Sequence, residues 1–579
     1  MSKKFFAAIC IILFLILSSS INAGSNSLVS RISSLTGNDS SSGKPLNYVP
    51  GELLVKYKQQ LSLSSINSLH SELNVTEIKR FPEINVHHIK LPSGTNVEDA
   101  LKAFKDNPAV EYAEPNYIRQ ISATTPNDTY FTNLWGMHNT GQTVNGITGT
   151  AGADIKATKA WDIATGNSAI IVGLIDSGVA YDHPDLAANI SATRYDFVNN
   201  NGNPMDSNDH GTHIAGTIAA VGNNNYGVAG VTWSTKIMPI RAGNANGSLT
   251  SANIISAINY ARTNGAKIIN ASFNGYSYSL SEYAAIAASR DAGILFVAAA
   301  GNGDQYGNGI NNDTTPDYPA SYNLDNIISV AATDQNDHLS SFSNYGLTSV
   351  HVGAPGENIY STKPARQTIF LQNFNGGSFP SGWTHGGTND TWGLSTDAST
   401  LAVNPTGNYL NNADAWVKTP VINLSSSRVT VLTFLFKGKS QLSDRLHVEV
   451  STDNTTWYDF GYLSGDWSTK WYSILVDLGG YDNGSTTFYV RFRFVSDASI
   501  NDIGFFIDDV TITAASTSYT GTDTDYYQFM DGTSMATPHV TGLAALIWGY
   551  LPSLTYSQVK DIIMRSVDLK SSLTGKTVS

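Results

Sequence analysis

A serine, a histidine and an aspartate stand in this sequence where they could carry out nucleophilic catalysis together. Ser534 lies in the string Gly-Thr-Ser-Met-Ala-Thr-Pro-His-Val (532–540), directly before an apolar, small-residue run that predicts a buried helix. At the first turn of a helix, the free N–H groups and the positive end of the helix dipole favour a developing negative charge. A serine hydroxyl is barely ionised at neutral pH, so it needs an adjacent base before it can attack an amide.

Two earlier segments could supply that base and its partner. Asp176 directly follows the continuous apolar run 170–175, which predicts a strand covered on both faces. A carboxylate at the carboxyl end of a parallel strand faces the crevice where ligands bind. His210 begins the string His-Gly-Thr-His-Ile-Ala-Gly-Thr, which reads as a loop entering a small-residue helix. The order along the chain is therefore Asp, His, Ser.

A fourth polar side chain follows another buried strand. The run Phe-Val-Ala-Ala-Ala-Gly-Asn (296–302) ends on the amide of Asn302. An amide N–H at this place could donate to the oxyanion of a tetrahedral intermediate, together with the backbone N–H of Ser534. Taken singly, each string has an ordinary interpretation, as a turn aspartate, a capping histidine, a strand-end amide or a helix cap.

Together the four strings resemble those of the subtilisin-like serine proteases, and Asp–His–Ser is the order of that family. The resemblance implies that Ser534 is the nucleophile, His210 the general base and then acid, Asp176 the group that orients the imidazole, and Asn302 the oxyanion donor. His213 shares the histidine motif and is expected to be structural. Three alternatives stay open: a catalytically dead homologue, a silent binding or adhesion protein, and a protease dedicated to ligation or to the maturation of one partner.

The same resemblance implies a substrate groove. Its expected lining is Ser272, Phe273, Asn274, Gly275 and Gly301. Relatives usually carry a glycine where this chain has Asn274, and that departure could narrow the groove. We expect a broad endopeptidase with a preference for an apolar or aromatic residue on the acyl side of the scissile bond.

The elements that must position these residues alternate apolar strands with small-residue helices from residue 126 to residue 365. Continuous apolar strands are predicted at 170–175, 236–240, 266–270, 293–298 and 326–331, with helices between them at 251–263 and 280–291. This alternation predicts an α/β fold with a doubly wound parallel sheet.

A segment with a different sequence pattern interrupts this alternation of strands and helices. From residue 368 to residue 514, short alternating segments recur without convincing helices, and six of the ten tryptophans lie there. This predicts an inserted antiparallel β-sandwich, similar to the jelly-roll modules of secreted hydrolases. The catalytic domain would then comprise 126–367 and 515–579. The tryptophans are expected mainly in the sandwich core; binding of a glycan or a protein by the sandwich is the alternative.

The first 120 residues have the patterns of export and maturation segments. Residues 1–23 have the charged start, short apolar run and small-residue end of a secretory signal, although a retained anchor is the alternative. Residues 24–47 are a Ser/Gly/Asn-rich linker. Residues 48–120 predict a small α+β unit, and Val-Glu-Tyr-Ala-Glu-Pro-Asn (110–116) makes it similar to subtilase pro-domains. That resemblance implies an intramolecular inhibitor and self-cleavage within 117–125.

Oxygen-rich clusters predict structural Ca²⁺, which binds carboxylate, amide and carbonyl oxygens. By resemblance to thermitase-like subtilases, the first site would use the side chains of Asp128, Asp185 and Asn224 and the carbonyls of Gly222, Tyr226 and Val228. Solvated turns are the alternative. A second, weaker site would use Asp196, Asn199 and Asn201, where amides stand in place of carboxylates and lower the affinity.

Composition narrows the remaining choices. The net charge of −13 argues against a nucleic-acid partner. The single cysteine, Cys10, lies in the signal, so a secreted product would hold no disulfide. We therefore expect an extracellular protein that leaves the membrane after signal cleavage, acts on proteins or peptides, and needs no organic cofactor. The family pattern usually continues further than Ser579, so a truncated C-terminus is also expected.

Overall fold

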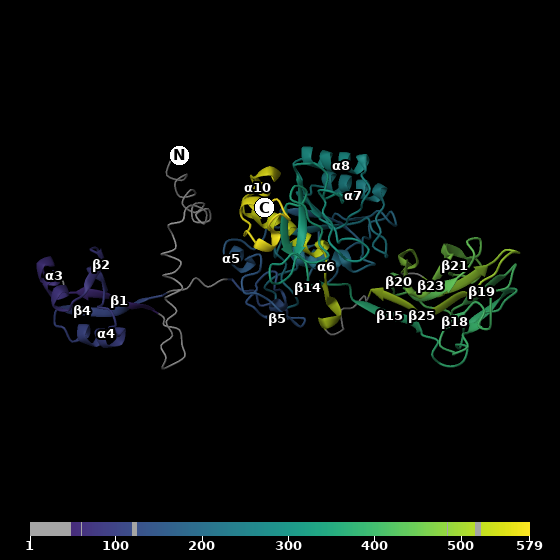
Figure 1. Cartoon of the computed structure of the whole chain (residues 1–579), viewed down its shortest axis with the longest axis horizontal. Helices are drawn as coiled ribbons and strands as arrows, with labels where there is room; N and C mark the ends of the chain where they lie inside the picture. The colour runs from purple at the N-terminus through teal and green to yellow at the C-terminus, as the bar shows by residue number, and fades with distance from the viewer. Residues whose placement is uncertain (1–47, 59–60, 119–123, 483–484, 516–522) are drawn as a thin grey trace. The chain divides into compact units, whose positions relative to one another are not determined.

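The computed structural model describes residues 48–58, 61–118, 124–482, 485–515 and 523–579, and the chain divides into two compact units between residues 122 and 123 (Figure 1). The predicted signal 1–23 and linker 24–47 lie outside the described residues, as do residues 119–123 of the predicted cleavage region. No helix in the described part of the chain is long and apolar enough to cross a bilayer.

The first unit is a four-stranded antiparallel sheet with two helices, in the strand order β2-β3-β1-β4. Its elements are β1 (Tyr48–Tyr57), α3 (Leu63–Glu72), β2 (Thr76–Phe81), β3 (Val86–Lys90), α4 (Val97–Lys105) and β4 (Val110–Tyr117). Ile66 of α3 and Phe104 of α4 are buried in one core with Leu53 and Val55 of β1. The predicted α+β architecture is confirmed; β2 is the one element that the sequence does not predict, because its polar residues face solvent at the sheet edge.

Seven parallel strands form the centre of the second unit, in the order β13-β12-β11-β10-β7-β9-β8. They are β7 (Ile171–Asp176), β8 (Tyr195–Asp196), β9 (Lys236–Arg241), β10 (Ile268–Ala271), β11 (Leu295–Ala299), β12 (Ile327–Thr333) and β13 (Val352–Pro355). The order runs one way from β7 to β9 and the other way to β10, so β7 lies at the switch point where open α/β sheets bind ligands.

Helices cover both faces of this sheet. Successive residues of β7 belong to different cores: Leu174 packs with α6 (His210–Ala219) and α9 (Thr533–Tyr550), whereas Ile175 packs with α7 (Ser251–Thr263) and α8 (Leu280–Asp291). Figure 1 shows α7 and α8 lying together along one face. Since neighbouring side chains of a strand point to opposite faces, the predicted doubly wound fold is confirmed.

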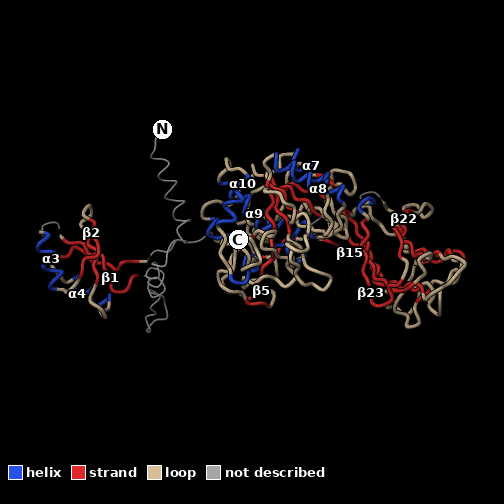
Figure 2. Tube along the Cα trace, turned by 45° about the horizontal axis from the view of Figure 1, so that its top comes forward, coloured by secondary structure: helices blue, strands red, loops and turns tan. Residues whose placement is uncertain are grey.

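The insert is a pair of antiparallel sheets around one apolar core, drawn in Figure 2 as a separate group of strands. Its strands are β15 (Arg366–Gln372), β16 (Thr384–Thr388), β17 (Gly393–Leu394), β18 (Leu401–Ala402), β19 (Asp414–Lys418), β20 (Arg428–Lys439), β21 (Arg445–Ser451), β22 (Tyr458–Leu463), β23 (Asp466–Asp477), β24 (Tyr489–Val495) and β25 (Gly504–Ala515). Trp383 and Trp392 are buried in this core, while Trp416, Trp457 and Trp471 are half-buried.

The two ends of the insert lie side by side. Arg366 at the start of β15 pairs with Ala515 at the end of β25. Just outside them, β14 (Ile359–Thr362) pairs with β26 (Tyr527–Met530). A chain that leaves and returns at one point can carry a whole domain without disturbing the sheet below it. The remaining short elements are η1 (Phe131–Asn133), β5 (Thr143–Val144), β6 (Ile147–Thr148), α5 (Ala157–Trp161), η2 (Ala187–Asn189), η3 (Gly479–Tyr481), η4 (Asp523–Tyr526), α10 (Tyr556–Arg565) and η5 (Ser571–Leu573).

Candidate active site

The predicted catalytic residues meet at the carboxyl edge of the sheet. Asp176 is the last residue of β7, Ser272 follows β10, and Asn302 follows β11, three strands that are neighbours in the order β11-β10-β7. His210 is the first residue of α6, and Ser534 the second residue of α9. Asp176, His210 and Ser272 line one cleft of about 490 Å³. The sheet thus gathers residues that are far apart in sequence into one crevice.

Asp176 and His210 form a direct pair. The imidazole Nδ1 lies 2.7 Å from the Asp176 Oδ1 atom, which also accepts a hydrogen bond from the Ser177 N–H at 2.7 Å. Burial alone would lower the pKa of His210, but the charge and hydrogen bond of Asp176 outweigh it and raise that pKa above its ordinary value. Gly211 permits this approach, because a Cβ there would lie 2.1 Å from the Gly178 carbonyl oxygen. The pair can therefore hold Nδ1 protonated and leave Nε2 to accept a proton.

Ser534 is buried beside this pair. Its Oγ donates to the Ser272 carbonyl at 2.9 Å, and among the described residues no hydrogen bond joins it to His210. Such catalytic contacts are often open before substrate binds and tighten in the complex. Attack by this hydroxyl requires a rotation about its Cα–Cβ bond, away from the Ser272 carbonyl and toward the imidazole.

Asn302 is oriented by the residue before the serine. Its Oδ1 accepts from the Thr533 N–H at 2.8 Å and from the Thr533 Oγ1 at 2.9 Å. A backbone N–H can only donate, so the atom facing it must be the amide oxygen. The amide nitrogen is consequently turned away from Thr533 and available as a donor. The N–H of Ser534, in the first turn of α9, has no intrahelical partner, so two donors stand at one place.

Of the predicted groove residues, Ser272, Phe273 and Asn274 line the cleft, while Gly275 forms a backbone bridge with Tyr318. Asn274, which departs from the family pattern, donates from Nδ2 to Asp317 Oδ2 at 2.7 Å. Asp317 is fully buried, and burial raises its pKa to about 6.

The predicted Gly301 lies against the same acid, since a Cβ there would come within 2.2 Å of the Asp317 Oδ2 atom. The other carboxylate oxygen of Asp317, Oδ1, is buried without a hydrogen-bond partner among the described residues. An amide thus covers a buried acid at the groove wall, a pairing that sequence reasoning missed because Asp317 lies 43 residues after Asn274.

A second buried carboxylate supports the histidine loop. Asp206 accepts five hydrogen bonds, two from the side chains of Ser177 and Thr212 and three from backbone N–H groups, those of residues 208 and 209 just before α6 and that of Thr212 in its first turn. Its charge also contributes to the raised pKa of His210. Sequence reasoning missed Asp206; a carboxylate four residues before the histidine was the available signal.

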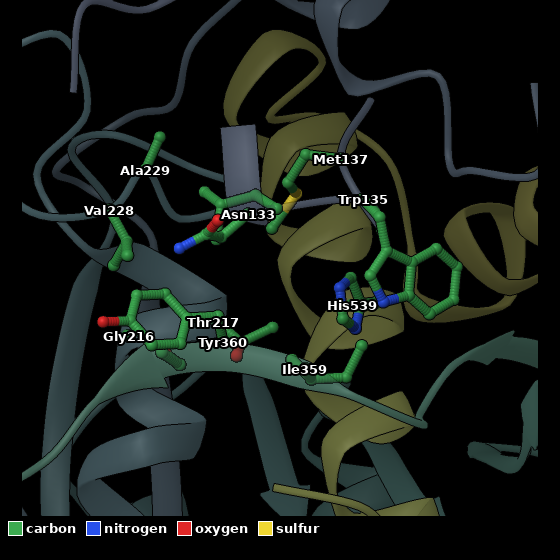
Figure 3. A pocket seen from close by; sticks show the side chains of 13 residues that line it. Asn133, Trp135, Met137, Gly216, Thr217, Val228, Ala229, Ile359, Tyr360 and His539 are labelled. Atoms are coloured by element: carbon green, nitrogen blue, oxygen red, sulfur yellow. The ribbon is translucent and has the colours of Figure 1, made fainter. Parts of the chain in front are cut away.

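The other histidines of the two motifs are structural. Nε2 of His213 lies 3.0 Å from the Ile359 carbonyl oxygen, and burial lowers its pKa to about 3. His539, five residues after the serine, lies beside Trp135 at a small pocket (Figure 3). That cavity of about 10 Å³ has room for one water at most, and burial lowers the pKa of His539 to about 4. This pocket is separate from the catalytic cleft.

The first predicted calcium site is gathered in space. Asp128 Oδ2 accepts from the Asn223 N–H at 2.7 Å, and Asp185 accepts from the Asn224 amide at 2.8 Å and from the Val228 N–H at 2.8 Å. Asp128 Oδ1 is buried without a hydrogen-bond partner in the described part of the chain.

Burial raises the pKa of Asp185 to about 7, and the neighbouring charge of Asp128 adds to the rise. Two buried carboxylates held by the same loop supply oxygen ligands of the kind that a hard cation binds. No group of three or more His, Cys, Asp or Glu side chains suited to a metal occurs in the described ranges, so this site would rely on amide and carbonyl oxygens as well.

The second predicted site already contains a cation. Arg241, almost fully buried, donates from Nη1 to Asp196 Oδ2 at 3.1 Å, and that oxygen also accepts from the Asn199 amide at 3.0 Å. Asn201 Oδ1 accepts instead from the Asn203 N–H. Because the guanidinium already pairs with the only carboxylate of the predicted set, this arrangement disfavours Ca²⁺.

Comparison with known families gives two matches. A model described as the subtilase family, Peptidase_S8, matches residues 167–408 and 496–577, and a model described as the fervidolysin N-terminal prodomain matches residues 35–116. The gap in the first match, 409–495, lies within the insert. All four candidate catalytic residues fall in the matched segments.

Among individual proteins, a thermophilic serine proteinase of Bacillus sp. (strain AK1) is 39% identical over 325 residues, 56% of this chain and 74% of that protein. Thermitase of Thermoactinomyces vulgaris is 43% identical over 210 residues, 36% of this chain and 71% of that protein. An extracellular protease of Xanthomonas campestris pv. campestris is 34% identical over 304 residues, 46% of this chain and 48% of that protein.

Proposed function

Since this chain belongs to the subtilase family and is a subtilisin-like serine endopeptidase with an N-terminal prodomain, we propose that Asp176, His210 and Ser534 are its catalytic triad. The observation that carries this proposal is the 2.7 Å contact between His210 Nδ1 and Asp176 Oδ1. Both residues line the same cleft as Ser272, whose carbonyl accepts the hydrogen bond of the Ser534 hydroxyl.

Each residue has a defined part in the reaction. Ser534 Oγ attacks the scissile carbonyl carbon while His210 Nε2 accepts its proton, and Asp176 stabilises the resulting imidazolium. The tetrahedral intermediate collapses as His210 returns the proton to the leaving amine, which leaves an acyl-enzyme on Ser534. Water, deprotonated by His210, then attacks the ester and regenerates the serine.

The oxyanion is stabilised by Asn302 Nδ2 and the Ser534 N–H. Thr533 supports this assignment, because its hydrogen bonds to Asn302 Oδ1 at 2.8 and 2.9 Å fix the direction of the amide before substrate arrives. Donors that are already in place need no reorganisation during the reaction, which is why they stabilise a transition state more than water does.

Maturation and export complete the proposal. The first unit would act as an intramolecular inhibitor until the enzyme cleaves itself within residues 117–125, and residues 1–23 would direct secretion. The matched prodomain and a relative named as an extracellular protease support this view. Substrates would be proteins or peptides with an apolar or aromatic residue on the acyl side of the cleaved bond.

Calcium is proposed as a structural ion at the first predicted site. Asp128, Asp185 and Asn224, with carbonyls of Gly222, Tyr226 and Val228, would hold it. The buried, unpartnered Asp128 Oδ1 and the raised pKa of Asp185 support the need for a positive charge there. The ion would lock the loop 222–228 against residue 128 and take no part in peptide cleavage.

The deciding experiment compares the wild-type chain with Ser534→Ala. Mass spectrometry of the purified products should find cleavage within 117–125 in the wild type alone, and a fluorophosphonate probe should label Ser534 alone in a tryptic map. An unlabelled, uncleaved wild type that is nonetheless folded by circular dichroism would favour the silent binding or adhesion protein.

A further inference from the structure

A hollow of about 430 Å³ lies between the insert and the catalytic domain. One side is formed by two strands of the insert, β22 and β23, and the other by the loop residues Asn244 to Asn246 together with Val198 and Asn199. Both compartments belong to the same compact unit. None of these residues takes part in the proposed chemistry, so the hollow needs an explanation of its own.

The insert walls of this hollow are sheet edges. β22 is the last strand of the five-stranded sheet and β23 the last strand of the six-stranded sheet. Within the described ranges, β22 pairs only with β21, and β23 only with β20. An edge strand presents a row of N–H and C=O groups that an extended peptide can pair with. In the hollow, the Gly461 N–H already donates to Asp459 Oδ1 and the Leu475 N–H to Asn246 Oδ1, so a ligand would pair with the remaining backbone groups of the two edges. The ligand class that fits two edge strands is an extended polypeptide.

The side chains point to the same class of ligand. Phe460 is 42% exposed and Tyr462 is 51% exposed, and both belong to β22. Leu463, Ile474 and Val476 add apolar surface inside the hollow. Exposed aromatic groups beside an apolar floor are typical of sites where peptide side chains bind.

The hollow and the catalytic cleft share one lining residue. Asn246 lines both, and its Oδ1 accepts a hydrogen bond from the Leu475 N–H of β23 at 3.3 Å. An ion pair between Asp477 of β23 and the buried Arg241 holds this edge of the insert against the catalytic domain. A polypeptide that enters the cleft beside His210 can thus continue past Asn246 along the insert.

We propose that this hollow is a second binding site for the polypeptide substrate, occupied by an extended segment remote from the scissile bond. The proposal rests on the proposed protease function. It makes the insert a part of substrate recognition, so that long or unfolded polypeptides are preferred over short peptides.

The proposed second site can be tested by steady-state kinetics with two substrates that share the same scissile sequence. One is a four-residue chromogenic peptide, and the other is an unstructured peptide of about 20 residues. In the variant F460A/Y462A, kcat/KM for the long peptide should fall about tenfold, mostly through KM, as expected for the loss of two aromatic anchors. The short peptide should change less than about twofold, because it cannot span both sites.

Trp471→Ala is the matched control. Trp471 is a half-buried insert aromatic with a cation over its ring, Lys437 at 4.6 Å, as Tyr462 has Arg445 at 4.2 Å, but it lines a different hollow. It should leave both substrates unchanged. Equal losses on both substrates, or no loss on the long one, would overturn the second site while leaving the protease function intact.

A binding measurement separates the two proposals further. The processed enzyme, inactivated at Ser534 with a sulfonyl fluoride, should bind fluorescent, reduced and alkylated casein, and F460A/Y462A should bind it about tenfold more weakly. Equal affinity of the two proteins would refute the second site. Failure of the reagent to label the folded wild type would instead refute the proposed function.

Discussion

Arg366, on the first strand of the insert, donates from Nε to Asp209 Oδ1 at 3.0 Å, and Asp209 is the residue directly before His210. Its Nη2 also donates to the Asp206 carbonyl at 3.0 Å. Asp209 has φ of 84°, a left-handed conformation that costs a non-glycine residue free energy and must be held by its surroundings. The insert therefore holds the loop that presents the proposed general base.

From this contact we predict that Arg366→Ala lowers kcat about 10- to 100-fold, because small displacements of a catalytic group have effects of that size. KM should change little. Arg428→Ala is the control, since Arg428 joins the insert to Asp182 at 2.5 Å, a residue outside the histidine loop. Both variants are measured on a short peptide. Equal losses of kcat would show that the reaction depends on docking of the insert in general and not on Arg366 in particular.

For the oxyanion donors, Asn302→Ala should lower kcat about 10²–10³-fold, the cost of losing the equivalent donor in subtilisin, a relative. Thr533→Val keeps the shape of the side chain but removes one of the two anchors of Asn302. We expect a smaller loss of about tenfold there. The double variant should be no worse than Asn302→Ala; additive losses would show that Thr533 does not act through Asn302.

The pH dependence follows from the Asp176–His210 pair. His210 must be neutral to accept a proton, so kcat/KM should fall as the pH drops through its pKa, which Asp176 raises. In Asp176→Asn that pKa is lower, and the acidic limb should move to lower pH while kcat falls by about 10⁴. A pH profile with an unmoved acidic limb would contradict the assignment of this pair.

The groove variant Asn274→Gly should change specificity. It removes one of the two amides that donate to Asp317 Oδ2, the other being that of Asn344, and should expose the carboxylate to the substrate groove. We expect kcat/KM for peptides with Lys or Arg before the scissile bond to rise severalfold, because a hydrogen bond to a charged group contributes about 1.5–3 kcal/mol.

The source of this gain can be tested by its pH dependence and by a control variant. Burial raises the pKa of Asp317 to about 6 in the wild type, so the carboxylate is charged only above that pH, and the gain should appear as the pH rises through it. Asn274→Gly with Asp317→Asn should lose the gain at every pH. A gain that survives this second change would exclude Asp317 as its source.

Removal of calcium should destabilise the enzyme. A ligand that binds only the folded state stabilises it by about 2.7 kcal/mol at 100 times its Kd, so a chelator should lower the midpoint of thermal unfolding. Asp185→Asn should abolish the dependence on calcium, whereas Asp196→Asn should retain it, because Arg241 already occupies the second site. The inactive Ser534→Ala background avoids self-digestion in this measurement.

The local sequence pattern was sufficient to predict those elements that bury one regular face along their whole length. The helices 251–263 and 280–291 have the predicted bounds. Their apolar residues recur every turn, and Thr250 caps the first helix as Ser279 caps the second. The short edge strands 195–196 and 76–81 were not predicted, since few of their residues are buried and only pairing with a neighbour makes them strands.

By itself, the sequence determined the fold class, the insertion of a β-sandwich and the identity of the proposed triad, because nucleophile, base and acid each need a specific residue type at the end of a regular element. Only the tertiary structure decided which groups support them. Arg366, Thr533 and Asp317 act through contacts between segments distant in sequence. Such contacts have no periodicity, so they become visible only when the sheet brings the segments together.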